Sequence, residues 1–168
     1  ICEPVPQGVT DGERSIDNIL FYTRLGQRII HILEARMTLG QLYEVDMRLR
    51  PSGNSGMLVS TLSGFASYQQ DTAWTWEHQA LVRARWVAGD AAVAAGFAQV
   101  RHAILTQVRD EHELACEVVR MRERMRKHLL PKSKGEKGEF HLKQGSGGIV
   151  DIEFRVQYAV LAWSSKQP

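Results

Sequence analysis

Residues 42–50 alternate between apolar and charged side chains, reading Leu-Tyr-Glu-Val-Asp-Met-Arg-Leu-Arg. Because successive side chains of a β-strand point to opposite faces, this alternation predicts a strand with one apolar and one charged face. The charged face holds two carboxylates and then two guanidinium groups, at Glu44, Asp46, Arg48 and Arg50. Such a face is either the solvated side of an antiparallel strand or a place where a metal ion and phosphates bind.

The residues that follow predict a turn and a second strand. Pro, Asn and two glycines punctuate residues 51–56, which is a composition typical of a turn. Residues 57–60 then form a second short extended run. We therefore expect a β-hairpin over residues 42–60.

The rest of the chain is predicted to be mainly helical. Thr10 and Glu13 fit a capping box, which predicts that a first helix follows and runs to about Met37. Apolar residues at helical spacing predict further helices at 62–70, 73–88, 91–108, 111–130 and 151–163. Residues 140–143 are compatible with a short strand. The predicted fold class is α+β, mostly α.

Composition bounds the class of protein. The chain has 168 residues, 43% of them hydrophobic and 24% charged, which fits one ordinary domain or a piece of a larger one. The net charge of +2 argues against a strongly basic nucleic-acid binder. The basic residues between Arg120 and Lys127 wind around their predicted helix instead of forming one patch, so no nucleic-acid partner is expected.

Other features bear on compartment and completeness. No run of about 18 apolar residues exists, so no membrane span is expected. Cys2 and Cys116 lack metal-ligand spacing, which favours a reduced, cytoplasmic protein. The sequence does not open with Met, and we expect that it begins partway through a gene product.

Charges within the predicted helix at 73–88 need an explanation. The helix is apolar on most sides, so Glu77, Arg83 and Arg85 require a partner, a ligand or a route to solvent. They are either internal ion pairs with stems reaching water, or ligand-binding groups.

A glycine-rich segment at 145–148 precedes the last predicted helix. Glycines let backbone amides approach a ligand, and a helix N-terminus favours anions. The spacing does not match a Walker loop, so a tight strand-to-helix turn is the alternative. Asp151 and Glu153 would then be favourable acids of a first helical turn, and Lys143 either reaches a phosphate or sits in water.

Three separated segments, 43–56, 73–85 and 147–154, together resemble the bacterial glutamine synthetase adenylyltransferases. The resemblance runs from about Asp11 to Trp163, and the Trp-Thr-Trp-Glu-His form at 74–78 is more similar to the adenylylating half of that family. It implies a nucleotidyltransferase that transfers AMP from ATP to a tyrosine of glutamine synthetase, or removes it by phosphorolysis, to regulate nitrogen assimilation.

The resemblance also implies an architecture and a site. Residues 1–60 would be a partial polymerase-β-like nucleotidyltransferase core, and 61–168 a mainly helical region with a Gly-rich strand-to-helix turn near 140–150. Family members place two metal-binding carboxylates in a Gly-Ser and Asp-x-Asp strand, which this sequence lacks, so the isolated chain is expected to be inactive. The implied cofactor is Mg²⁺, and the implied partners are ATP, glutamine synthetase and a nitrogen-signalling PII-type protein. The implied site residues are Asp46 as catalytic group and metal ligand, Glu44 as a second metal ligand, and Arg48, Arg50, Arg85 and Lys143 as phosphate-binding groups.

A second hypothesis is a non-catalytic interaction domain. The helices predicted at 91–130 would then bind glutamine synthetase or a nitrogen-signalling protein. The residues do not separate adenylylation from its reversal, because both reactions use the same carboxylate chemistry.

Overall fold

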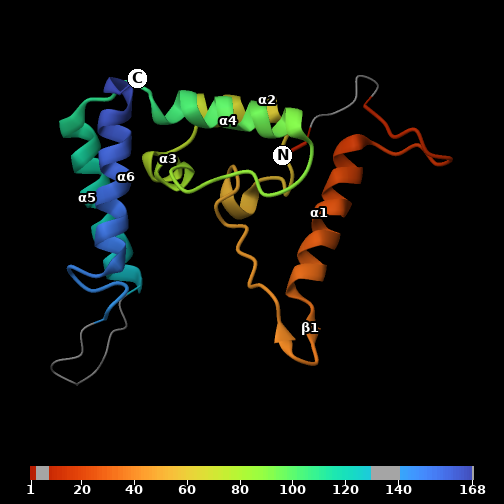
Figure 1. The fold of residues 1–168 in the computed structure, drawn as a ribbon, viewed down its shortest axis with the longest axis horizontal. Coiled ribbons are helices and arrows are strands. Elements are labelled where there is room, and N and C mark those ends of the chain that lie inside the picture. Colours follow the sequence, from red (N-terminus) through yellow and green to blue (C-terminus); the bar gives the residue numbers. More distant parts are fainter. Residues whose placement is uncertain (3–7, 130–140, 168) are drawn as a thin grey trace. The chain divides into compact units, whose positions relative to one another are not determined.

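The computed structural model describes residues 1–2, 8–129 and 141–167 of the chain (Figure 1). Within these residues, helices dominate and the sheet has only two short strands, so the prediction of a mostly α fold is confirmed. The helices are α1 Asn18–Glu34, α2 Leu62–Asp71, α3 Thr75–Leu81, α4 Ala91–Leu105, α5 Glu111–Leu129 and α6 Ile149–Trp163, with 3₁₀ turns at Gly53–Ser55 and Ser164–Lys166.

The chain divides into two compact units. The first comprises residues 1–73 and 86–98, and the second comprises residues 74–85 and 99–168. Residues 130 and 140, which begin or end predicted elements, lie outside the described residues. The described residues 141–143 form no strand, so the short strand expected there is wrong for them.

In the first unit, α1 begins later than the sequence suggested. Asp17 is its N-cap, and the Asp17 carboxylate accepts a hydrogen bond from the Leu20 amide at 3.0 Å. Thr10 instead accepts from the amide of Ile16 at 3.1 Å, so the predicted capping box is wrong. Of the described residues of α1, only Asn18 is buried, which leaves much of the predicted apolar stripe exposed or half-buried.

The predicted hairpin over 42–60 is also wrong. Residues 42–50 form an irregular segment that ends in a turn, and the sheet of this unit is instead β1 (Arg36–Met37) paired antiparallel with β2 (Gly40–Gln41). A strand needs a neighbour for its backbone amides. The Tyr43 amide instead donates to the Leu33 carbonyl, the Arg48 amide to the Asp46 carboxylate and the Arg50 amide to the Met47 carbonyl. Tyr43 and Leu49 are 59% and 62% exposed.

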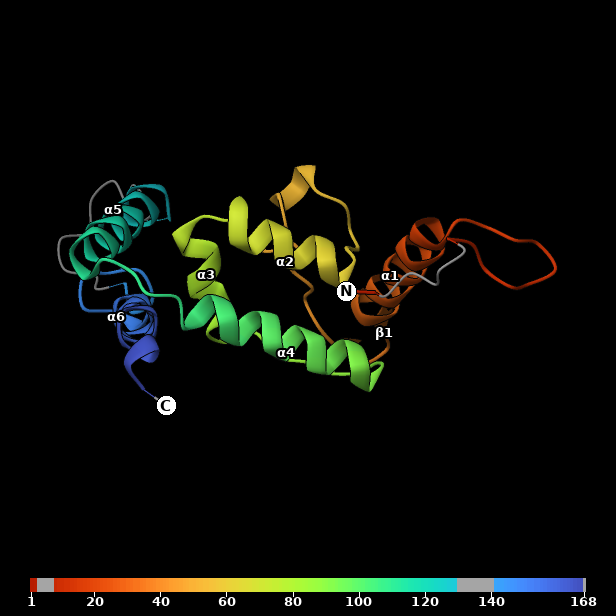
Figure 2. The same cartoon turned by 90° about the horizontal axis from the view of Figure 1, so that it is seen from above.

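Helix α2 also packs on the first part of α4 (Figure 2). Thr61 caps α2 by accepting from the Gly64 amide at 2.9 Å, which confirms a helix starting at Leu62. The rings of Phe65 and Phe97 lie with their centroids 5.7 Å apart.

The second unit is built on α5 and α6, which lie side by side with α3 packed on both (Figure 1). The apolar spacing of α5 correctly predicted the burial of Leu114 and Val118. Leu129, in contrast, is 52% exposed. The core of this unit consists of Leu81, Ile104, Leu105, Leu114, Val118, Val150, Leu161 and Ala162.

Helix α3 is much shorter than the predicted helix over 73–88. It ends at Leu81, where Arg101 donates 2.7 Å hydrogen bonds to the carbonyl oxygens of Leu81 and Val82. A helix leaves its last carbonyls without intrahelical donors, and this guanidinium fork satisfies two carbonyls at that end. The contact with Arg101 therefore stabilises an end of α3 at Leu81, although the spacing of apolar residues predicted a helix that continues to residue 88.

No helix in the described ranges combines the length and the hydropathy that a bilayer crossing requires.

The turn before α6 requires glycine, and this generates a prediction. A Cβ at Gly148 would lie 2.5 Å from the Leu142 carbonyl oxygen, whereas one at Gly12 would meet nothing within 4 Å. Gly148→Ala should destabilise the start of α6 by about 1–3 kcal/mol, because backbone would have to shift. Hydrogen exchange of residues 149–155 should then accelerate by roughly tenfold or more. The matched Gly12→Ala should leave this exchange unchanged, and equal protection in both variants would contradict the account.

Candidate functional site

The exposed loop at 44–50 carries the charged residues that the sequence singled out. Asp46 and Arg48 form a bidentate ion pair, with Arg48 Nε 2.9 Å from Asp46 Oδ1 and Nη2 2.5 Å from Oδ2. The Arg48 amide also donates to Asp46 Oδ1 at 2.9 Å, which closes a short side-chain turn. Their side chains are 51% and 77% exposed, so both groups are accessible to solvent.

Arg50 has a different role in the same loop. Its Nη1 donates to the Met47 carbonyl at 2.8 Å, and its Nε and Nη2 donate to the carbonyls of Gly56 and Asn54 at 3.4 Å. These bonds hold residues 47–56 in a compact turn. The proposed phosphate role of Arg50 stays a prediction, and the turn gives this guanidinium a structural role as well.

The electrostatics of Asp46 follow from Arg48. Hydrogen bonds from the Arg48 side chain, and then from its amide, lower the pKa of Asp46 from 3.8 to about 2. The same contact raises the pKa of Arg48. Asp46 is therefore an anion throughout the neutral range, which is the protonation state that a metal ligand needs.

The loop does not complete a metal centre from the residues described. Mg²⁺ prefers about six oxygen ligands in octahedral geometry. In the described ranges, no group of three or more His, Cys, Asp or Glu side chains is placed to hold a metal ion. Asp46 and Glu44 line one hollow of about 590 Å³, and both oxygens of Asp46 already accept from Arg48. Two carboxylates, one of them engaged, do not by themselves fit a magnesium site.

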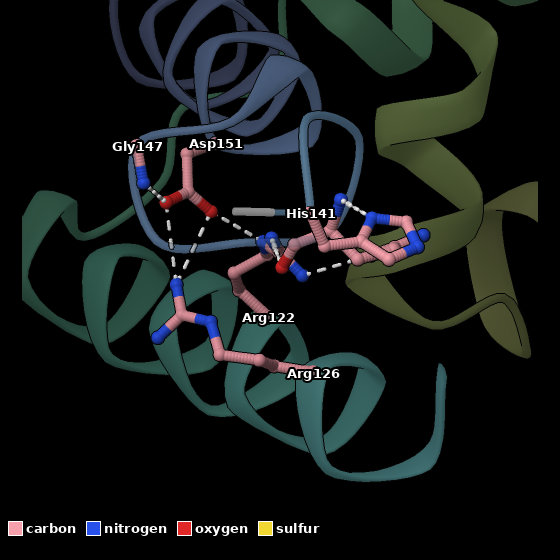
Figure 3. Close-up of polar contacts among 6 residues, drawn as sticks. Arg122, Arg126, His141, Gly147 and Asp151 are labelled. Atoms are coloured by element: carbon pink, nitrogen blue, oxygen red, sulfur yellow. Dashed lines mark hydrogen bonds and ion pairs between the residues drawn. The ribbon is translucent and has the colours of Figure 1, made fainter. Parts of the chain in front are cut away.

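The glycine-rich segment forms a tight turn in which the amides of its three glycines bond within the protein, and Figure 3 shows the bond of Gly147. Gly147 has φ +82°, and its amide donates to Asp151 Oδ2 at 2.6 Å. The Gly145 amide donates to the His141 carbonyl at 2.6 Å, and the Gly148 amide to the Gly145 carbonyl at 3.0 Å. The turn therefore fits the structural alternative better than an anion-binding loop, because three of its amides point at protein acceptors.

Asp151 joins this turn to α5. It accepts from Arg122 Nε at 2.5 Å and from Arg126 Nη2 at 3.2 Å, as Figure 3 shows. Arg122 also donates to the side-chain and main-chain oxygens of Gln144 at 3.2 and 2.9 Å. The hydrogen bond from the Gly147 amide, together with the two arginines, lowers the pKa of Asp151 although burial opposes the shift.

Sequence reasoning missed this cluster. Arg122 is 6% exposed on the same face of α5 as Leu114 and Val118. An arginine that interrupts an apolar stripe at helical spacing needs a buried acceptor. The position of Arg122 in the stripe of α5 is therefore the sequence signal that could have revealed the cluster. For Asp151 the sequence predicts only a favourable position in a first helical turn, because its arginine partners lie 25 and 29 residues earlier in the sequence.

The structure shows the surroundings of the charged residues in and after α3, and of Lys143. Glu77 is 6% exposed and accepts from the Trp74 amide at 2.9 Å. Arg83 pairs with Glu153 of α6 at 2.7 Å, which favours the structural reading of both charges. Arg85 and Lys143 are exposed, and their phosphate roles stay predictions.

Comparison with known proteins places these features in a family context. The family model described as Glutamate-ammonia ligase adenylyltransferase matches residues 1–100. A Hahella chejuensis protein named bifunctional glutamine synthetase adenylyltransferase/adenylyl-removing enzyme is 58% identical over 161 residues, covering 95% of this chain and 17% of the relative. Proteins of the same name from Pseudomonas putida and Psychromonas ingrahamii are 55% and 56% identical, covering 97% and 93% of this chain and 18% and 16% of the relatives. The chain thus spans about one sixth of the length of these curated relatives.

The Asp46–Arg48 pair predicts a specific titration. Carboxyl-carbon NMR of the chain should show Asp46 titrating near pH 2, since the Arg48 hydrogen bonds favour the anion. Arg48→Ala should return the midpoint toward 3.8. As a control, Arg24→Ala on α1 should leave the Asp46 midpoint in place. A midpoint near 3.8 in the parent chain would show that the pair does not form in solution.

The Asp151 cluster predicts a pH-dependent stability difference. Asp151→Asn leaves the buried Arg122 without its anionic partner, so the free energy of unfolding should fall by roughly 2 kcal/mol at pH 7. Because the folded pKa of Asp151 is lowered, its contribution is present above the unfolded carboxyl pKa of about 3.9 and is lost as pH falls through the folded pKa. Urea unfolding should therefore show the difference shrinking below about pH 4.

The matched control is Glu153→Gln, which removes an ion pair whose arginine is largely exposed. It should change the free energy of unfolding by no more than about 1 kcal/mol. Equal losses in the two variants would contradict a special role for the buried cluster.

Proposed function

Because this chain belongs to the glutamate-ammonia ligase adenylyltransferase family, we propose that it is a segment of a nucleotidyltransferase that modifies glutamine synthetase. The reaction proposed is transfer of AMP from ATP to a tyrosine of glutamine synthetase, its removal by phosphorolysis, or both. The name of these relatives includes both activities. This modification would regulate nitrogen assimilation, with a PII-type signalling protein as a further partner.

The single observation that carries the proposal is the exposed Asp46 loop within the residues that the family model matches. In the proposal Asp46 supplies one carboxylate of a Mg²⁺ site, with Glu44 beside it, and other parts of the longer protein supply the rest. Residues 1–60 then belong to the nucleotidyltransferase core, and 61–168 to the helical region. The segment alone is proposed to be inactive, because the described residues hold too few carboxylates for two metal ions.

Arg48 has a second part in this proposal. A guanidinium fork matches a phosphate as well as a carboxylate. The Asp46–Arg48 pair is exposed, so each group can exchange its partner at little energetic cost. Arg48 is then free to bind a phosphate of ATP. Arg50, Arg85 and Lys143 are proposed as further phosphate contacts. Arg50 would bind a phosphate while still donating to the carbonyls that hold residues 47–56 in a turn.

A second function is favoured by a different observation. Four large apolar residues of α6 repeat at i, i+3, i+7 and i+14 and are 47–61% exposed, at Ile149, Ile152, Val156 and Trp163. Such spacing is typical of a helix face that packs on another helix. In the interaction-domain alternative, this face of α6 would act together with the helices at 91–130. These surfaces would bind glutamine synthetase or a PII-type protein without nucleotide.

The enzymatic proposal predicts loss of transfer in a conservative variant. In the full-length protein that contains this chain, Asp46→Asn should slow AMP transfer to glutamine synthetase by about a hundredfold or more, because even the outer-shell partners of a metal site cost roughly 10–100-fold when they are mutated. The control is Asp71→Asn, which alters an exposed carboxylate at the end of α2 and should leave the rate unchanged. A normal rate in Asp46→Asn would end the catalytic assignment.

The interaction-domain alternative has a separate test. Calorimetric binding of glutamine synthetase or a PII-type protein without nucleotide, lost in Val156→Glu, would support that alternative.

A further inference from the structure

A groove runs between α5 and α6 on the second unit. It has a volume of about 420 Å³, which lies within the range typical of small-molecule sites. Its lining residues come from these two helices alone, so its shape follows directly from their packing. The function proposed above makes no use of it.

The floor of the groove is apolar and partly aromatic. Val118 and Val119 of α5 face Phe154 and Tyr158 of α6 across it. Val119 is 57% exposed, although such a residue is more often buried. A ring or a branched hydrocarbon placed here would remove this surface from water, which is favourable.

The end of the groove near the Gly-rich turn is cationic. Arg122, Arg126 and Arg155 line it against two acids, Glu123 and Asp151. Arg122 is committed to Asp151 and Gln144, so it is not available to a ligand. The remaining guanidinium groups, those of Arg126 and Arg155, decide what the groove can hold.

Both remaining guanidinium groups have donors to spare. Arg126 gives one nitrogen, Nη2, to Asp151 (Figure 3). Its other nitrogens donate to no acceptor among the described residues, and Nε is buried. The Nε atom is closed off from the groove, whereas the Arg126 side chain as a whole is 33% exposed, so a ligand would meet its terminal nitrogens. The exposed side chain of Arg155 makes no hydrogen bond or ion pair with any residue in the described ranges. Forked donors of this kind match a carboxylate or a phosphate.

We propose that the α5–α6 groove binds a small molecule that carries a carboxylate or phosphate on an apolar, ring-sized body. The anion lies at Arg126 and Arg155, and the body lies against Phe154, Tyr158 and Val119. The site is separate from the Asp46 loop and does not depend on the proposed transfer reaction.

The test uses the full-length protein and three matched probes. Saturation-transfer NMR is recorded with 1-naphthoate, 1-naphthyl phosphate and the neutral 1-naphthamide, with ATP in excess so that a nucleotide site is blocked. At least one of the two anions should bind roughly tenfold more tightly than the amide. Which anion binds better identifies the ligand as a carboxylic acid or a phosphate ester.

Variants place the binding in the groove. Arg155→Ala should weaken the anion by about tenfold, and Val119→Glu should abolish its binding. Arg124→Ala, on the same helix but outside the groove, should leave affinity unchanged. No hydrogen bond or ion pair among the described residues depends on the Arg155 side chain, so its variant stays informative if Val119→Glu fails to fold. Equal binding of the amide and the anions, or undiminished binding in Arg155→Ala, would overturn the proposal.

Discussion

A buried guanidinium organises the second unit of this chain. Taking a charge out of water costs several kcal/mol unless it is paired and hydrogen-bonded. Arg122 meets this requirement with the carboxylate of Asp151 and two oxygens of Gln144. Asp151 in turn fixes the Gly147 amide, so one carboxylate joins α5, the glycine-rich turn and the start of α6. The close approach of the turn at Gly148, and the groove beside the cluster, both follow from this arrangement.

The Asp46–Arg48 ion pair is exposed, so in contrast to the Arg122–Asp151 pair it is not needed for stability. Exposed ion pairs add little stability, because water solvates both partners well when they separate. A pair that is not needed for stability is free to exchange its partners, and this suits a group that binds a ligand. The buried ion pair of Arg122 with Asp151 thus holds the structure together. The exposed ion pair of Arg48 with Asp46 leaves both side chains available to a ligand.

The sequence predicted helices far better than it predicted strands or the cluster. The stripe of α5 and the cap of α2 are local features, so Leu114, Val118 and Thr61 behave as expected. The alternation at 42–50 describes a strand only where a neighbouring strand supplies backbone partners, and the described residues supply none. The end of α3 depends on Arg101, some twenty positions along the chain. The Arg122–Asp151 pair likewise joins distant residues, which periodicity alone does not reveal. The sequence predicts one face and two separate roles for Asp46 and Arg48, a metal ligand and a phosphate contact, and their direct pairing is seen only in the structure.

We propose that Asp46 takes part in the chemistry of the longer protein and that Asp151 holds the second unit together. One measurement separates them: AMP transfer to glutamine synthetase by the full-length protein, with Asp46→Asn and Asp151→Asn compared at a temperature where circular dichroism shows both folded. The account predicts that the Asp46 variant is inactive while the Asp151 variant transfers AMP at close to the parental rate. The reverse pattern, with activity lost only in the folded Asp151 variant, would contradict it.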